Sequence, residues 1–296
     1  MLLVTMVIWG STFVVTKGVN EQVQPFTLAL VRVAIGAIVL LGCALVRQAR
    51  GGSHSPWSTL PWGTIIAMAL IGVVLYYAVF NYSLVYTSAS QGALVQSCIP
   101  AMTALVAVVW LREHASAMRW TGIALSMIGV LIVFSGADAE SGSASLLGNV
   151  LMFFSAVLWG VYTSMAKRVA DYDPLQVTGG IIGAGALMLI PLAAFEVAAA
   201  GVPTVDLRGW LGMAYLGAGA SGFAYLMYSA ALKHVDASEA GVYTNLIPIV
   251  GVITGILLGD PLSARAIIGG LVVLLGVWLT SRQPAPASPP RTSTAP

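Results

Sequence analysis

The sequence predicts an all-α integral membrane protein whose ten transmembrane helices form two inverted five-helix repeats around a central cavity. Composition is the first reason, because 58% of the 296 residues are hydrophobic and only 8% are charged. A soluble globular domain carries about 25% charged residues. The mean hydropathy of +0.91 agrees with a membrane protein. The net charge of +2 is small and scattered, so no nucleic-acid partner is expected.

An internal repeat is the second reason. The segment ASQGALVQSCIP at residues 89–100 aligns with ASEAGVYTNLIP at residues 237–248. Trp9 matches Trp159 at nearly the same offset, and Tyr77 matches Tyr225. The repeat therefore covers almost half of the chain, which is far longer than the unit of a solenoid.

Ten apolar segments supply the predicted spans, because about 20 apolar residues cross a bilayer as a helix. No basic residue precedes the first segment, so a cleaved signal peptide is not favoured there. In order, the spans are residues 2–16, 25–46, 60–82, 90–111, 120–135, 147–166, 174–199, 210–232, 237–258 and 264–280.

The distribution of lysine and arginine orients these spans. Nine lysine and arginine residues lie on the side that holds both termini, and three lie on the other side. Arg32 is left out of the count because it falls inside a span. Cytoplasmic loops are enriched in basic residues, so both termini are predicted to be cytoplasmic. Five spans per repeat place the second repeat upside down relative to the first, as in many secondary transporters. The predicted units are residues 1–136, residues 147–281 and a disordered cytoplasmic tail at 282–296.

Aromatic and amide side chains inside the spans are the predicted substrate-binding residues. Such residues either line a wet cavity or pack and hydrogen-bond between helices, and the sequence leaves both readings open. A neutral or zwitterionic amino acid would suit aromatic faces together with amide groups. The predicted set is Tyr77, Phe80, Gln96, Trp159, Tyr162, Tyr225, Tyr228, Tyr243 and Asn245.

Two prolines and three charged residues complete the predicted site. Pro100 and Pro248 lie halfway along matching spans, where each removes a backbone hydrogen bond and would kink its helix. Arg32 lies about 10 Å into its span, and an ionisable group at that depth is a functional candidate unless it snorkels or has a structural partner. Lys17 and Glu239 stand at span ends as candidate gating charges, with a solvated helix end as the alternative.

Several kinds of chemistry are not expected. No Asp or Glu lies at the centre of a predicted span, which argues against a proton-coupled carrier with one buried carboxylate. The three histidines lie in predicted loops, and no zinc-protease, nucleophile-elbow or phosphate-loop pattern occurs. We therefore predict no enzyme activity, no catalytic residue, no metal site and no cofactor.

The segments WGSTFVVTKGV, YTSASQGALVQSCIP and WLREHAS, with the arginine of the second span, resemble the EamA domain, and the second half of the chain resembles it again. Two EamA repeats are typical of the drug/metabolite transporter superfamily. One departure is Asp260, where the family usually has glutamate; Glu113 keeps that residue in the first repeat. The departure makes an essential carboxylate less expected there.

Within that superfamily the chain looks most like bacterial amino acid exporters, including the aromatic amino acid exporter group. The resemblance implies export of aromatic or neutral amino acids, or related small metabolites, across the bacterial plasma (inner) membrane by alternating access. One chain carries both halves, so a monomer embedded in the lipid bilayer is expected to suffice. The alternatives are an exporter of drug-like organic cations and, in a different class, a membrane scaffold or receptor that transports nothing.

Overall fold

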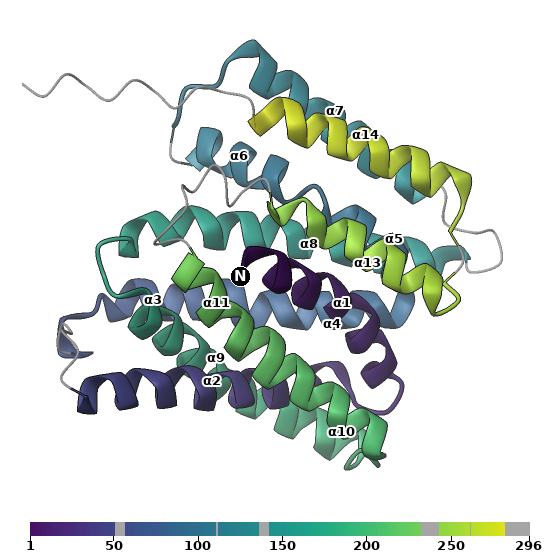
Figure 1. The fold of residues 1–296 in the computed structure, drawn as a ribbon. Coiled ribbons are helices and arrows are strands. Elements are labelled where there is room, and N and C mark those ends of the chain that lie inside the picture. The colour runs from purple at the N-terminus through teal and green to yellow at the C-terminus, as the bar shows by residue number, and fades with distance from the viewer. Residues whose placement is uncertain (51–56, 111, 136–141, 232–242, 261, 282–296) are drawn as a thin grey trace, which may run out of the picture.

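The computed structural model describes residues 1–50, 57–110, 112–135, 142–231, 243–260 and 262–281, and every regular element in these ranges is helical (Figure 1). The prediction of an all-α multi-pass membrane protein is confirmed. The first half comprises α1 (Leu2–Asn20), α2 (Pro25–Ala49), η1 (Trp57–Thr59), α3 (Trp62–Ala69), η2 (Leu70–Leu75), α4 (Tyr76–Tyr86), α5 (Ala89–Gln96), α6 (Ile99–Trp110) and α7 (Ala117–Ser135). The second half comprises α8 (Gly142–Ala166), η3 (Lys167–Val169), α9 (Pro174–Ala200), α10 (Leu207–Ala214), η4 (Tyr215–Phe223), α11 (Ala224–Ala231), α13 (Leu246–Leu257) and α14 (Ala264–Ser281).

Most predicted spans appear as single long helical segments. Within the described ranges, eight segments are long and apolar enough to cross a membrane, and Leu246–Leu257 is a shorter apolar helix. The predicted eighth span corresponds to α10, η4 and α11 in succession. The first residues of the predicted ninth span, 237–242, lie outside the described part of the chain, as does the predicted tail at 282–296.

The helix contacts reflect the internal repeat. Helices α2 and α9 are equivalent in the two halves and pack against each other, as do α7 and α14. Figure 1 shows α7 beside α14 at one edge of the bundle. The remaining contacts come in related pairs. Helix α4 packs on α8 as α11 packs on α1, and α6 packs on α8 as α13 packs on α1. The structure is thus built from two equivalent halves that interlock.

The crossing of α7 and α14 depends on glycines in both halves. A Cβ on Gly122 would lie 2.6 Å from the carbonyl oxygen of Gly276, and one on Gly129 would lie 2.7 Å from that of Gly269. Small residues allow such close approach of membrane helices, where van der Waals packing replaces the hydrophobic effect as the driving force.

Two π-helical segments, η2 and η4, interrupt the third and eighth spans at matching positions. A π-bulge widens the helix by one residue and often marks a functional site. Each segment ends two residues before a tyrosine of the predicted site, which is Tyr77 after η2 and Tyr225 after η4. The widened turns therefore set where these rings lie.

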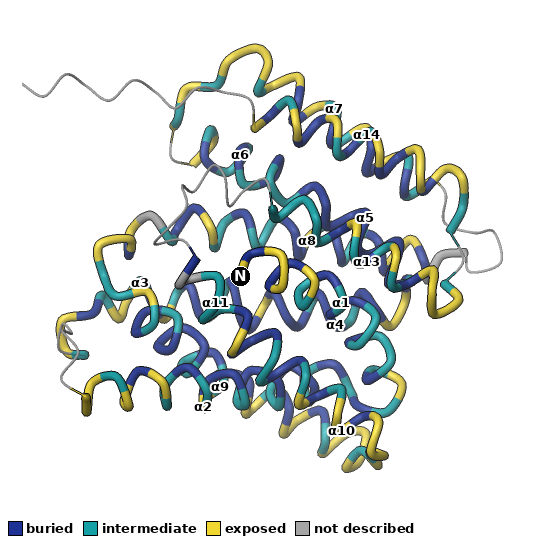
Figure 2. Tube along the Cα trace, viewed as in Figure 1, coloured by how far each residue is buried: buried dark blue, intermediate teal, exposed yellow. Residues whose placement is uncertain are grey.

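Exposed residues lie along the outer helices of the bundle (Figure 2), and many of them are large and apolar. Phe195 is 76% exposed, Ile38 73% and Leu187 70%. A water-soluble monomer rarely exposes large contiguous apolar patches, whereas lipid tails are as apolar as these side chains. The exposed apolar surface is therefore the surface that faces the bilayer.

Candidate functional site

The first aromatic group lies between α4 and α8. The ring centroid of Tyr76 is 5.2 Å from that of Tyr77, 5.7 Å from that of Phe80 and 5.0 Å from that of Trp159. The Tyr162 ring lies 5.1 Å from Trp159. These separations are within the range at which aromatic pairs attract each other beyond simple burial. Four of the five residues belong to the predicted site, and Tyr76 joins them.

Gln96 connects this group to the end of α5. Its side-chain amide donates to the hydroxyl of Tyr76 at 3.2 Å and to the hydroxyl of Ser155 at 2.9 Å. All three groups are buried. A buried amide is costly unless it is hydrogen-bonded, so Gln96 is held in place by partners from two other helices. Ser155 lies one helical turn before Trp159, a spacing that could have suggested it from the sequence.

The second aromatic group joins α1 to α11. The Trp9 ring lies 5.3 Å from Tyr225 and 5.3 Å from Tyr228. Its indole N–H donates to the carbonyl oxygen of Ala220 in η4 at 3.1 Å. Tyr243 packs against the same buried apolar cluster as Trp9 and Tyr228. The sequence repeat already matched Trp9 with Trp159, and this match was the signal that could have added Trp9 to the site.

Tyr225 brings the two groups together. Tyr225 and Tyr162 both pack against the core cluster that contains Tyr76 and Tyr77. Tyr77 is buried, whereas Tyr162 and Tyr225 keep part of their surface accessible. Side chains from both halves therefore converge in one region of the bundle, and some of them are only partly buried.

Arg32 lies beside this convergence. Its guanidinium carbon is 4.3 Å from the centroid of the Tyr77 ring, and the residue is only 3% exposed. Its Nε and Nη1 atoms have no hydrogen-bond partner within the described structure. The site thus combines aromatic rings, one anchored amide and one buried positive charge.

The other predicted residues lie away from the rings or outside the described structure. Lys17 donates to the carbonyl oxygen of Thr87 at 2.6 Å, which ties the end of α1 to the turn before α5. Glu239 lies outside the described residues. The role of Lys17 as a gating charge stays a prediction.

Both predicted kink regions contain a helix break. Ser97 and Cys98 separate α5 from α6, and Asn245 is a turn residue directly before α13. Each break begins three residues before the proline, Pro100 or Pro248. The breaks therefore occupy equivalent places in the two halves.

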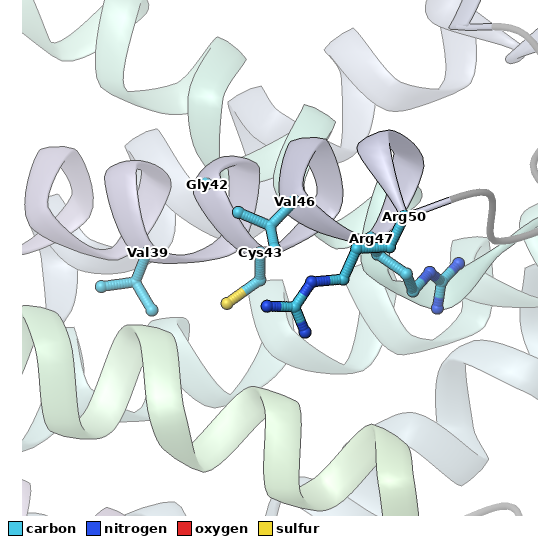
Figure 3. A pocket seen from close by; sticks show the side chains of 6 residues that line it. All are labelled: Val39, Gly42, Cys43, Val46, Arg47 and Arg50. Carbon is cyan, nitrogen blue, oxygen red and sulfur yellow. The ribbon is translucent and has the colours of Figure 1, made fainter.

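Two crevices lie apart from the aromatic centre. The larger, of about 530 Å³, follows the second half of α2, and Figure 3 shows its lining by Val39, Gly42, Cys43, Val46, Arg47 and Arg50. The smaller, of about 180 Å³, is lined by Ser97, Pro248 and neighbouring apolar residues. Neither includes a described aromatic residue of the predicted site. Among the described residues, no group of three His, Cys, Asp or Glu side chains is placed to hold a metal ion.

Comparison with known proteins gives a consistent result. The model of the EamA-like transporter family matches residues 1–135 and again residues 146–282. An uncharacterized transporter of Archaeoglobus fulgidus is 30% identical over 95% of this chain and 96% of its own length. The uncharacterized transporter YyaM of Bacillus subtilis is 27% identical over 95% of this chain and 92% of its own. A solved crystal structure aligns over 94% of both chains with a TM-score of 0.62 and 22% identity, which is a likeness of fold.

Proposed function

Because the chain belongs to the EamA-like transporter family, we propose that it is a secondary transporter that exports aromatic or other neutral amino acids, or closely related metabolites. Family membership supports a multi-pass membrane transporter with a small-molecule substrate. The substrate class is our inference from the side chains of the site.

The convergence of aromatic rings around Gln96 carries this proposal. Tyr76, Tyr77 and Trp159 offer flat apolar faces to an aromatic or aliphatic side chain. The electron-rich faces of such rings also attract an ammonium group. Small-molecule sites typically combine apolar walls with a few placed polar groups, and the Gln96 amide is such a group. An amino acid has both kinds of surface.

The pseudo-symmetric construction supports alternating access. Inverted repeats bind substrate near the bilayer midplane, and rocking of one repeat against the other opens the site to each side in turn. The helix breaks at Ser97–Cys98 and Asn245 are places where such rocking would bend the helices. We propose that both termini face the cytoplasm, that the protein resides in a bacterial inner membrane and that a monomer is the functional unit.

Flux through proteoliposomes tests the function. Purified protein in liposomes should move labelled phenylalanine down its gradient, with a rate that saturates as the phenylalanine concentration rises. Flux without an imposed proton gradient is expected, because no described acidic side chain lies among the aromatic rings. Strict dependence on a proton gradient would reject the facilitated mechanism.

The rival functions give different outcomes in the same assay. A scaffold or receptor would give no flux above that of empty liposomes for any compound. An exporter of organic cations would move tetraphenylphosphonium but not phenylalanine. A rate that never saturates would indicate a channel rather than a carrier.

A further inference from the structure

Arg32 carries a charge that the described structure does not neutralise. Two ion pairs in the described structure join Arg47 to Asp173 and Arg119 to Glu113, and Arg32 takes part in neither. Two of its three side-chain nitrogens are buried without a hydrogen-bond partner. A guanidinium does not lose its proton in proteins, so the positive charge persists at this position.

A charge in this place is costly unless something offsets it. Removing an ion from water costs several kcal/mol even after the protein relaxes. A snorkelling arginine lowers that cost by reaching the headgroups, but a side chain that is 3% exposed does not reach the bilayer surface. The Tyr77 ring offsets part of the cost through its electron-rich face. The N–H groups of Nε and Nη1 still lack an acceptor within the described structure.

The contact with Tyr77 gives the guanidinium a ring face but no oxygen acceptor. The guanidinium carbon lies 4.3 Å from the ring centroid. Nε and Nη1 both remain without a partner in the described part of the chain, and the donor set of an arginine matches the two oxygens of a carboxylate well.

A second buried polar group lies on the same side of α2. Ser221 of η4 is fully buried, and its hydroxyl has no partner within the described structure. A Cβ on Gly36, one helical turn after Arg32, would lie 2.8 Å from the Ser221 Cβ. A Cβ on Gly217, one turn before Ser221, would lie 3.0 Å from the Arg32 carbonyl oxygen. The π-helical segment and α2 thus hold two unpartnered polar groups one turn apart.

We propose that Arg32 is the anion subsite of the transported molecule and accepts its carboxylate, while the adjoining aromatic rings hold the rest of it. This inference rests on the proposed function and sharpens it. Cargo must carry a carboxylate, and organic cations are disfavoured because Arg32 repels them. Tyr77 acts as a positioning residue, because its ring contacts the guanidinium.

Four related compounds separate the carboxylate from the rest of the molecule. Phenylalanine has a carboxylate and an ammonium group, 3-phenylpropionate has the carboxylate alone, and phenylalaninamide and phenethylamine have no carboxylate. Wild-type proteoliposomes should transport the first two compounds and discriminate against the last two by about 10- to 100-fold, as expected for loss of a charge-assisted hydrogen bond.

Variants of Arg32 assign this discrimination to one residue. Arg32→Gln should lose the discrimination, and Arg32→Lys should restore part of it, because a lysine keeps the charge without the planar donor set. Arg168→Gln is the matched control, since Arg168 is exposed and its guanidinium carbon lies 5.3 Å from the Trp110 ring centroid. Monodisperse elution and wild-type unfolding temperature establish that each variant has folded.

The outcomes distinguish failure of this inference from failure of the proposed function. If Arg32→Gln folds and still prefers phenylalanine to phenethylamine as the wild type does, the inference is wrong while amino acid transport stands. If the wild type moves 3-phenylpropionate but not phenylalanine, the anion subsite stands and the amino acid substrate is rejected. If replacing chloride by methanesulfonate, which has no carboxylate, abolishes ligand discrimination, an inorganic anion holds the site and the inference is overturned.

Discussion

At the two ends of the α2–α9 pair, a carboxylate from a different place accepts hydrogen bonds from the first amides of a helix. At one end, Glu196 of α9 accepts hydrogen bonds from the first amides of α2, those of Phe26 at 3.2 Å and Thr27 at 2.7 Å. At the other end, Asp173 caps its own helix α9 through two backbone amides and pairs with Arg47 of α2. Glu196 and Arg47 occupy matching positions, each 22 residues after the proline that begins its helix.

The difference shows what the repeat preserves. The first amides of a helix need an acceptor, and an anion there also interacts favourably with the helix dipole. Asp173 supplies it from the residue before α9, whereas the matching Gln24 makes no such bond and the neighbouring helix supplies Glu196 instead. Both halves thus provide an acceptor for the first amides of the helix, but a different residue provides it in each half.

The centre of the same helices shows a difference of another kind. Arg32 of α2 matches Ile181 of α9, and the two are 3% and 1% exposed. Burial is equal, but only one position carries a charge. Structural needs account for Glu196, Asp173 and Arg47 at the ends of the pair, because each of them has a partner. They do not account for Arg32, which is why we assign it to the substrate.

The largest expected effect is at Glu196. Glu196→Leu removes the acceptor of two α2 amides, and of the hydroxyls of Thr27 at 2.9 Å and Tyr82 at 3.1 Å. We expect the free energy of unfolding to fall by about 3 kcal/mol, because buried donors without an acceptor cost about 1–3 kcal/mol each and some will find water. Unfolding in mixed micelles of increasing SDS fraction measures it.

Phe195→Leu is the control for this change, because the neighbouring side chain faces lipid. Glu196→Gln keeps one acceptor oxygen and should fall between the wild type and Glu196→Leu. If Glu196→Leu unfolds like Phe195→Leu, the end of α2 does not depend on α9.

A smaller effect is expected at the cap of α9. Asp173→Ala should reduce stability by about 1 kcal/mol, which is typical for loss of a capping side chain. Asp173→Asn keeps the cap and loses only the charge, so it should be milder. The difference between the two variants, measured in the same micelles, separates capping from pairing with Arg47.

The contribution of Asp173 should also depend on pH. Burial opposes its ionisation, but hydrogen bonds from Arg47 and two α9 amides outweigh burial and hold the pKa of Asp173 below its ordinary value. Such a group stabilises the fold above the unfolded pKa of about 3.9 and loses that contribution as the pH falls through the folded pKa. The stability difference between wild type and Asp173→Asn should shrink below pH ~4. A difference that stays constant to pH 3 would contradict this linkage.

The smallest expected effect is at Arg47. Its side chain is 36% exposed, and exposed ion pairs contribute about 0–1 kcal/mol. Arg47→Ala should therefore lower stability by about 0.5 kcal/mol, with less effect at high salt because ions screen the pair. Arg50→Ala serves as the comparison. A loss as large as that of Glu196→Leu would show that the two ends are equivalent after all.

The fold was predictable because its signals are strong and local. Apolar length marks spans, and the repeated Ala-Ser starts and Ile-Pro ends align the halves before any contact is known. The π-helical segments were not predictable, because η2 and η4 have the same apolar composition as an ordinary span. Their signal is geometric and arises only when neighbouring helices pack against the widened turns.

The candidate site was predictable in part. Tyr77, Gln96 and Trp159 stood out as polar or aromatic residues deep in apolar spans, and the structure places them in one neighbourhood. Ser155 and Ser221 were missed, because a serine in a membrane helix usually bonds to its own backbone. Ser155 differs from the others because it also accepts from Gln96, and Ser221 differs because its buried hydroxyl has no partner within the described structure.

The central claim is that Arg32, unlike the matching Ile181, holds the cargo through its charge. Replacing Arg32 tests this claim most directly. Counterflow of labelled phenylalanine should be measured in proteoliposomes with wild-type protein, Arg32→Ile and the conservative control Ile181→Leu. We predict that Arg32→Ile loses at least about tenfold in rate while Ile181→Leu keeps the wild-type rate. Folded Arg32→Ile protein that exchanges phenylalanine as fast as the wild type would contradict the claim that the first half alone supplies the charge that holds the cargo.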